Sequence, residues 1–247
     1  MRKLILLSTG GTIAATVGPH GLEVNVGTEE LLESTRRLRG GGSIRVEPRE
    51  IHRIVSSAAS VSDILALARA IRTASRDADG IVVTHGTDSM EESAFLTALT
   101  HESTVPVAFT GAQRPFDHPA PDGPANLAAA LSWLGDPRSD GTGVSIVFDG
   151  EVLPAVGTRK VHTKALKAFQ SPGRSPVAAI DDSGVRVFAT SPRAPAVLSP
   201  AIEPPRVDVV SQYLGVDTTA LRASVAAGAR GLVLAGFGVG NATPETI

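Results

Sequence analysis

Two glycine turns flanked by hydroxyl side chains are the first places in this sequence where chemistry could occur. "LLSTGGTIAAT" (Leu6–Thr16) and "IVVTHGTDSMEE" (Ile81–Glu92) each begin with an apolar run and continue with threonines around glycine. Glycines permit a tight turn with positive φ and leave backbone N–H groups pointing outward. Such N–H groups can cradle a phosphate, or hold the oxyanion that forms when an acyl carbon is attacked.

Three interpretations of these turns remain open on the pattern alone. Phosphate binding is one, although "STGGT" has neither the lysine of GxxxxGK[ST] nor the spacing of GxGxxG. A purely structural glycine turn is another. Acyl transfer is the third, and it requires a threonine nucleophile, which is weak and needs a base to take its proton.

Charged residues near the turns favour acyl transfer. Asp88 follows Thr87 directly, and Lys160 in "VGTRKVHTK" comes shortly after another predicted strand end. A lysine desolvated in a cleft can lose its proton near neutral pH and act as a base. The β-branched threonine side chain is stiff about χ1, which helps to hold its oxygen in place.

The elements that must position these residues alternate between strand and helix. The strand-like runs are Lys3–Leu7, Ile44–Glu47, Gly80–Thr84, Pro106–Thr110, Val144–Phe148 and Val185–Ala189. The helix-like segments are Thr28–Leu38, Ser62–Ala74, Met90–Leu99 and Pro124–Leu134. This alternation predicts an α/β fold, a large N-terminal domain with a mostly parallel sheet covered by helices. Because ligands bind at the carboxyl ends of parallel strands, we expect Thr9–Thr12 and Thr84–Asp88 to face one crevice.

A proline-rich stretch, "SPRAPAVLSPAIEPPR", predicts a linker between two domains. We predict an N-terminal α/β domain over residues 1–190, the linker over 191–206, and the start of a smaller α/β domain over 207–247. The last part contains strand Val207–Ser211, helix Thr218–Ala227 and strand Gly231–Ala235. A single βαβ unit leaves apolar surface uncovered, so we expect this domain to be C-terminally incomplete or to lean on another surface.

Composition excludes several classes of function. The absence of cysteine excludes disulfides, thiolate catalysis and cysteine-ligated metals. A net charge of −2 and a pI near 6.3 provide no basic field for nucleic acid or an anionic membrane. The histidines show no ligand spacing, so we predict no metal site. No run approaches the roughly 18 apolar residues of a membrane span, and the first apolar run is too short for a signal peptide, so we expect a cytoplasmic protein.

Four segments, in order, resemble the signature segments of the bacterial L-asparaginase family. They are "STGGTIA", "THGTDSMEE", "TGAQRPFDHPAPDGPANL" and "LAGFGVGN". The resemblance implies a threonine amidohydrolase that attacks a side-chain amide, expels ammonia and hydrolyses an acyl-enzyme. It also implies a small-molecule substrate, L-asparagine or L-glutamine, no cofactor, and a homo-oligomer (dimer or tetramer).

The catalytic residues implied by this resemblance come from three segments. Thr12 matches the family's nucleophile, Thr87 its second catalytic threonine, and Lys160 the lysine that partners Thr87. Asp88 is implied to hold the α-ammonium of the substrate by charge pairing.

The implied substrate-binding residues are more dispersed. Ser56 falls at the family's substrate-carboxylate serine, and Ser57 takes the next position. Gly11 and the backbone N–H of Thr87 are the expected oxyanion donors. Asn241 matches an asparagine that reaches the site from the second domain of a neighbouring subunit.

Two features depart from the family pattern. The loop "TVGPHGLEVNVG" lacks the tyrosine that helps to activate the nucleophile, leaving Glu23 or His20 as substitutes. Family members also continue past this point and supply a glutamate to the partner's site, so we expect this chain to be C-terminally incomplete.

The alternatives to an asparaginase are a glutaminase or related amidase, and an inactive substrate-binding fragment. One methylene separates asparagine from glutamine, a difference worth only about 1–3 kcal/mol of discrimination. A nucleotide-binding α/β protein that uses the TGGT turn is a further alternative.

Overall fold

The computed structural model describes residues 1–36, 38, 44–189, 197–199, 201 and 203–247. The chain divides into two compact units, Met1–Ala201 and Ile202–Ile247. Of the predicted linker, residues 191–196, 200 and 202 lie outside the described residues. In the described part of the chain, every helix is too short or too polar to cross a membrane.

An eight-stranded sheet forms the centre of the first unit, with the order β12-β11-β8-β7-β6-β5-β1-β4. Its strands are β1 (Arg2–Gly10), β4 (Ile44–Ile54), β5 (Gly80–Thr84), β6 (Val107–Thr110), β7 (Val144–Phe148), β8 (Glu151–Pro154), β11 (Ala178–Asp181) and β12 (Gly184–Val187). Neighbouring strands are parallel from β4 to β7 and antiparallel from β7 to β12. The predicted α/β class is confirmed, and the predicted strand Val185–Ala189 is the antiparallel edge strand β12.

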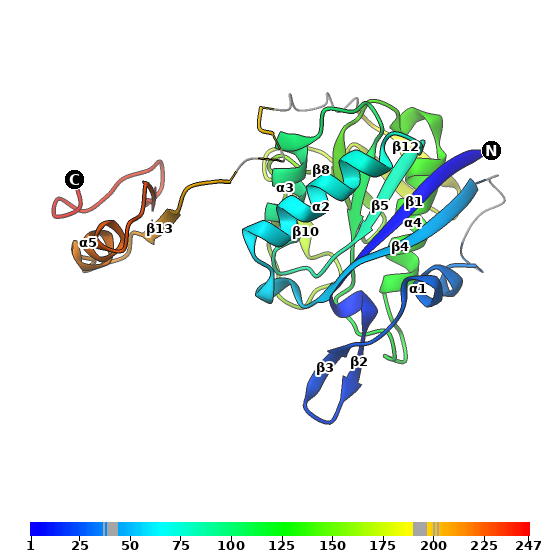
Figure 1. Cartoon of the computed structure of the whole chain (residues 1–247), viewed down its shortest axis with the longest axis horizontal. Coiled ribbons are helices and arrows are strands. Elements are labelled where there is room, and N and C mark those ends of the chain that lie inside the picture. Colours follow the sequence, from blue (N-terminus) through cyan, green and yellow to red (C-terminus); the bar gives the residue numbers. More distant parts are fainter. Residues whose placement is uncertain (37, 39–43, 190–196, 200, 202) are drawn as a thin grey trace. The chain divides into compact units, whose positions relative to one another are not determined.

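Four helices cover the two faces of this sheet. They are α1 (Thr28–Ser34), α2 (Val61–Ala74), α3 (Met90–Thr100) and α4 (Gly123–Gly135). Because side chains alternate across a strand, Ile5 and Leu7 of β1 pack in one core with α2 and α3. Leu4 and Leu6 pack in the other core with α1 and α4. Figure 1 shows α2 in front of the sheet.

The start of α2 shows how local sequence places one of these helices. Ser60 caps it, with its hydroxyl accepting from Asp63 N–H at 3.2 Å. The Asp63 carboxylate in turn accepts from Ser60 N–H at 2.8 Å, which completes a capping box. This cap fixes the point at which the chain turns from the segment containing Ser56 into the helix.

The strand order places a topological switch point beside β1. The chain leaves β1 for β4 on one side and later returns to β5 on the other side. The carboxyl ends of neighbouring strands in such a sheet are where ligands bind. The two glycine turns follow β1 and β5 directly, so the fold brings both of them to this position.

The sequence did not predict several short elements. The segment after the first turn forms a hairpin of β2 (Ala15–Gly18) and β3 (Gly21–Val24), which projects from the unit in Figure 1. Val17 N–H donates to the Asp117 carboxylate at 3.0 Å and ties the hairpin to the loop after β6. Another small pair, β9 (Arg159–Lys160) and β10 (Phe169–Gln170), is antiparallel and carries Lys160.

The second unit consists of one βαβ arrangement. Its strands, β13 (Val207–Ser211) and β14 (Gly231–Ala235), are parallel and have the bounds expected from the sequence. The helix between them, α5 (Thr219–Ala226), is one residue shorter at each end than expected.

Candidate active site

The two glycine turns touch each other through their backbones. A Cβ atom added to Gly11 would lie 2.4 Å from the Cα of Gly86, so no other residue fits at this contact. Gly11 also has a φ of 78°, a conformation that favours glycine. Next to this contact, the Thr9 hydroxyl donates to the carbonyl of Thr84 at 2.9 Å and joins the ends of β1 and β5.

Thr12 and Thr87 are the residues that follow the two touching glycines. Thr12 begins a short 3-10 turn, Thr12–Ala14, and is half-buried. Its hydroxyl makes no hydrogen bond with any other group among the described residues. Thr87 is buried. The Thr12 hydroxyl therefore has no partner among the described residues, whereas the Thr87 hydroxyl is hydrogen-bonded to Lys160 and Gln113.

Lys160 holds the Thr87 hydroxyl and contacts Asp88. Its ammonium donates to Thr87 Oγ1 at 2.8 Å and to Asp88 Oδ1 at 2.8 Å. The Lys160 side chain is 16% exposed and that of Asp88 is 64% exposed. The lysine is thus shielded by its contacts, while the carboxylate opens to solvent, where it could meet a cation.

Gln113 is a contact of Thr87 to which sequence reasoning assigned no role. The Thr87 hydroxyl donates to Gln113 Oε1 at 3.2 Å. Gln113 lies just past the carboxyl end of β6, the strand next to β5. A polar side chain after a third parallel strand was the signal that could have pointed to it.

Glu91 is a second residue that sequence reasoning did not place in the site. It lies in the first turn of α3, and its carboxylate accepts from the backbone N–H of Lys160. It also pairs with Arg159 at 3.2 Å. Glu91 therefore fastens the short strand β9 to the helix that begins just after Asp88.

Ser56 lies against the second turn, and Ser57 does not. Ser56 is buried, and its hydroxyl accepts from the backbone N–H of Asp88 at 3.2 Å. Its carbonyl accepts from the Ser89 hydroxyl at 2.8 Å. Ser57 is exposed on the same short turn, Ser56–Ala58.

The expectation that Gly11 N–H serves as an oxyanion donor is wrong. That group donates to the carbonyl of Ile54 at 2.9 Å, at the end of β4. The register between β1 and β4 shifts between Ser8 and Gly10, which brings Ile54 into this position. Within the described residues, the backbone N–H groups of Thr12 and Thr87 donate to no other group. The oxyanion role of Thr87 N–H stays a prediction.

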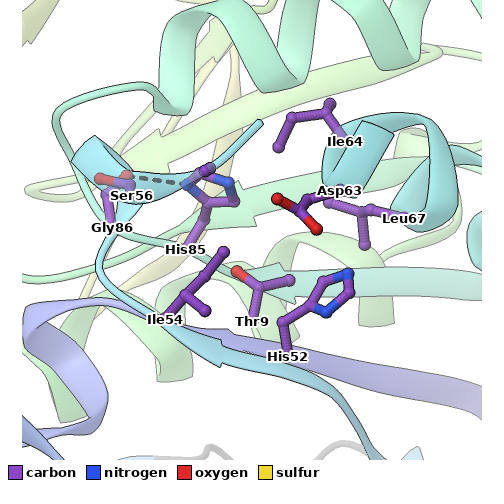
Figure 2. A pocket seen from close by; sticks show the side chains of 10 residues that line it. Thr9, His52, Ile54, Ser56, Asp63, Ile64, Leu67, His85 and Gly86 are labelled. Carbon is purple, nitrogen blue, oxygen red and sulfur yellow. Dashed lines mark hydrogen bonds between the residues drawn. The ribbon is translucent and has the colours of Figure 1, made fainter. Parts of the chain in front are cut away.

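A small pocket lies behind the second turn (Figure 2). His85 lines it, with Nδ1 at 2.8 Å from the Gly86 carbonyl and Nε2 at 3.1 Å from the Ser93 hydroxyl. Burial lowers the pKa of His85, so the ring is neutral and donates from Nδ1 to the carbonyl. His85 thereby fixes the backbone of the turn.

The same pocket contains His52 and Asp63, which Figure 2 shows beside Thr9. Its enclosed space admits only about one water molecule, which is too little for an amino acid. Nowhere in the described ranges do three or more histidine or acidic side chains form a group that could hold a metal ion. We therefore place the candidate site on the Thr12 and Thr87 side of Gly86.

Asn241 lies in the second compact unit. Its backbone pairs with Phe237, with hydrogen bonds of 2.8 and 2.9 Å, and closes the turn after β14. Its expected role in a site shared between subunits stays a prediction.

Comparison with known proteins gives a consistent result over the whole chain. Residues 3–193 match the family model "Asparaginase, N-terminal", and residues 206–247 match "Glutaminase/Asparaginase C-terminal domain". The chain is 33% identical to L-asparaginase 2 of Escherichia coli, with 97% of this chain and 71% of that protein covered. It is 32% identical to the probable periplasmic L-asparaginase of Haemophilus influenzae, with 97% and 70% covered.

The structural comparison agrees with the sequence comparisons. The probable cytoplasmic L-asparaginase of Campylobacter jejuni matches with a TM-score of 0.89 and 28% identity, covering 100% of this chain and 77% of that one. The four signature segments had predicted the same relationship. The chain belongs to the bacterial L-asparaginase family.

Proposed function

We propose that this protein hydrolyses the side-chain amide of L-asparagine to L-aspartate and ammonia, with Thr12 as nucleophile. The family model and the named relatives support an asparaginase activity. The observation that carries the assignment of residues is the cluster of Thr87, Lys160 and Asp88 at the corner that adjoins the Thr12 turn. An ion pair as exposed as Lys160–Asp88 contributes only about 0–1 kcal/mol to stability, so its value lies in positioning the two groups.

In the first half of the reaction, Thr12 Oγ1 attacks the amide carbon of asparagine. Its proton passes to Thr87 Oγ1 while the hydrogen of Thr87 passes to the neutral amine of Lys160, so that the pair acts as the base. The carbon–nitrogen bond then breaks, the leaving nitrogen takes a proton from the same pair, and ammonia departs. An aspartyl ester on Thr12 remains.

In the second half, water attacks the carbonyl carbon of this ester. The water proton passes to the base, the bond to Thr12 Oγ1 breaks, and that oxygen regains a proton. The sum is one asparagine and one water converted to one aspartate and one ammonia. Both halves develop negative charge on the same carbonyl oxygen, and we propose the free backbone N–H groups of Thr12 and Thr87 as its donors.

The remaining groups fit the two charged ends of an amino acid. Asp88 uses Oδ1 for Lys160, and its Oδ2, which accepts no hydrogen bond among the described residues, is available to the α-ammonium. Ser56 Oγ accepts from Asp88 N–H and keeps its own hydrogen to donate to the α-carboxylate. Ser57 and Asn241 stay proposed substrate contacts on the resemblance alone.

Three finer properties are also proposed, two from the names of relatives and one, the oligomer, from the family resemblance. A family member from Pseudomonas aeruginosa, 29% identical, is named glutaminase-asparaginase, so L-glutamine is a second candidate substrate. Comparing kcat/KM for the two amides decides between them. A homo-oligomer and a cytoplasmic location are also proposed, the latter from the Campylobacter jejuni protein, although the Haemophilus influenzae relative is periplasmic. Light scattering and cell fractionation test these two proposals.

Substitution of Thr12 tests the nucleophile. Thr12→Ala removes the attacking oxygen, and we expect ammonia release from asparagine to fall by on the order of 10³-fold or more. The thermal midpoint should stay unchanged because the Thr12 hydroxyl makes no hydrogen bond in the described structure. The matched variant Thr12→Ser keeps a hydroxyl and should retain measurable turnover. Full activity in a folded Thr12→Ala protein would show that another group attacks.

The same assay separates an enzyme from a binding module. If calorimetry detects binding of aspartate or asparagine but no ammonia forms, the chain is a substrate-binding fragment rather than an active asparaginase.

A further inference from the structure

We propose that Gln113 is a positioning residue that orients the Thr87 hydroxyl and joins it to the segment following Lys160. This inference rests on the proposed function, because it takes Thr87 and Lys160 as parts of the catalytic machinery. It adds a residue that comes from a third strand end and that neither the motifs nor the composition had assigned.

The Gln113 side chain connects two parts of the site. Its Oε1 accepts from the Thr87 hydroxyl at 3.2 Å. Its Nε2 donates to the carbonyls of Thr163 at 3.1 Å and Ala165 at 3.0 Å. These carbonyls lie three and five residues after Lys160 along the chain. One amide group therefore holds both the hydroxyl and the segment that carries the lysine.

The orientation of this amide is dictated by its neighbours. A backbone carbonyl can only accept a hydrogen bond, so the two carbonyls require the NH₂ group on their side. If the amide were turned over, Oε1 would face the carbonyl oxygens of Thr163 and Ala165. All three atoms are acceptors, so no hydrogen bond could form there. The Oε1 atom is consequently directed at Thr87 and offers it an acceptor only.

This arrangement sets the direction of the hydrogen on Thr87. The Lys160 ammonium is a donor without a lone pair, and at 2.8 Å it occupies one lone pair of Thr87 Oγ1. While Lys160 is an ammonium, the hydroxyl hydrogen therefore points to Gln113. Gln113 and Lys160 thus hold Oγ1 in place, and proton transfer begins when the neutral amine of Lys160 can take this hydrogen.

The backbone on either side of Gln113 is also held. The Asp122 carboxylate accepts from Gln113 N–H and from Arg114 N–H, both at 2.9 Å. The Arg114 guanidinium donates to the Ala120 carbonyl at 2.9 Å and braces the same loop. These contacts fix the backbone from which the Gln113 side chain extends.

His162 also holds the segment that follows Lys160. The Nδ1 of His162 accepts from the backbone N–H groups of Lys164 at 3.1 Å and Ala165 at 2.9 Å. Glu91 holds the other end through Lys160 N–H. Gln113 is the member of this set that also reaches a proposed catalytic hydroxyl, so its loss should affect turnover more than folding.

Two substitutions of Gln113 distinguish the role of its acceptor oxygen, Oε1, from that of its donor NH₂ group. Gln113→Met keeps the approximate length of the side chain and removes the three hydrogen bonds of its amide group. We expect kcat to fall about 3–10-fold, the loss typical of one neutral hydrogen bond, here the one to Thr87, with KM changing much less. Gln113→Glu keeps an acceptor for Thr87 and removes the donors to Thr163 and Ala165. We expect it to retain more kcat than Gln113→Met.

The division of the effect between kcat and KM and the partial rescue by Gln113→Glu are readouts that a packing role would not change. Gln170→Met, an exposed glutamine on β10, is the control and should keep the wild-type kcat.

The outcomes distinguish the possibilities. Wild-type kcat in a folded Gln113→Met protein overturns the inference, and so does an equal loss of kcat in both variants, which would show that the acceptor for Thr87 has no part in turnover. Thermal melts of each variant exclude unfolding as the cause. Failure of the proposed function is a separate result, namely a wild-type protein that releases no ammonia, or a Thr12→Ala protein that still does.

Discussion

At the scale of single residues, the two threonines of the candidate site differ in how they are held. The Thr12 hydroxyl is uncommitted in the described structure, whereas the Thr87 hydroxyl is fixed from two sides by Lys160 and Gln113. An attacking oxygen must be free to reach its target, and a proton-transfer group gains from a fixed position. The different surroundings of two identical side chains thus fit two different roles.

His85 gives a prediction about pH and stability. Burial lowers its pKa from 6.5, so below pH 6.5 the unfolded chain binds a proton that the folded protein does not. The free energy of unfolding should therefore fall as the pH is lowered from about 6.5. His52 and Asp63 line the same pocket, and a charge on His52 adds to the effect on His85.

Chemical denaturation between pH 5 and pH 8 measures this dependence. In His85→Asn the amide can still donate to the Gly86 carbonyl, so we expect a folded protein that is about 1–2 kcal/mol less stable at pH 8. Its stability should fall less between pH 6.5 and pH 5 than that of the wild type. An equal slope in both proteins would mean that His85 binds a proton in the folded state as readily as in the unfolded chain.

At the scale of elements, the site depends on a two-residue strand fastened to a helix. β9 is too short to hold Lys160 by its pairing with β10 alone. Glu91, in the first turn of α3, supplies an acceptor for Lys160 N–H and a partner for Arg159. The helix that starts after Thr87 and Asp88 therefore also positions the lysine.

Substitution of Glu91 tests this connection. Glu91→Ala removes the acceptor, and we expect kcat to fall about 10-fold, with a loss of about 1–2 kcal/mol in stability, because a partly buried N–H is left without a partner. Glu91→Gln retains an acceptor oxygen and should remain close to the wild type. Glu92→Ala changes the neighbouring, exposed glutamate of the same helix and serves as the control. Equal kcat in the Glu91→Ala and Glu92→Ala proteins would show that the contact has no part in turnover.

The elements that the sequence predicted are those with a strong local signal. Buried strands such as Gly80–Thr84 and Val144–Phe148 are continuous apolar runs, and the structure has the same bounds. The β2–β3 hairpin and the pair β9–β10 are short and contain many polar residues. Their pairing is set by contacts with distant parts of the chain, such as Asp117 for the hairpin, which no local pattern encodes.

At the scale of the whole molecule, the residues of the site also divide into those with a local sequence signal and those without one. The motifs singled out Thr12, Thr87 and Asp88, because each follows a strand end at the switch point. Lys160 could be separated from other lysines only by family resemblance, since its partners lie 72 and 73 residues away in the sequence. Long-range contacts of this kind become visible only in the folded chain.

The correction at Gly11 has the same origin. Its sequence indicates an outward N–H group, but a register shift between β1 and β4 brings the Ile54 carbonyl to it. Glu91 and Gln113 were missed for the related reason that their side chains act on segments 50 to 69 residues away. Sequence thus predicted the fold and the meeting of the two glycine turns, while the contacts that support the candidate site depend on tertiary structure.

A crystal structure of the protein with bound L-aspartate tests the central proposal most directly, because it shows where the reacting carbon lies. We predict that the side-chain carboxylate lies about 3–3.5 Å from both Thr12 Oγ1 and Thr87 Oγ1, with the α-ammonium on Asp88. Aspartate bound with that carboxylate beyond the reach of either threonine would contradict the proposal that both hydroxyls act on one carbonyl carbon.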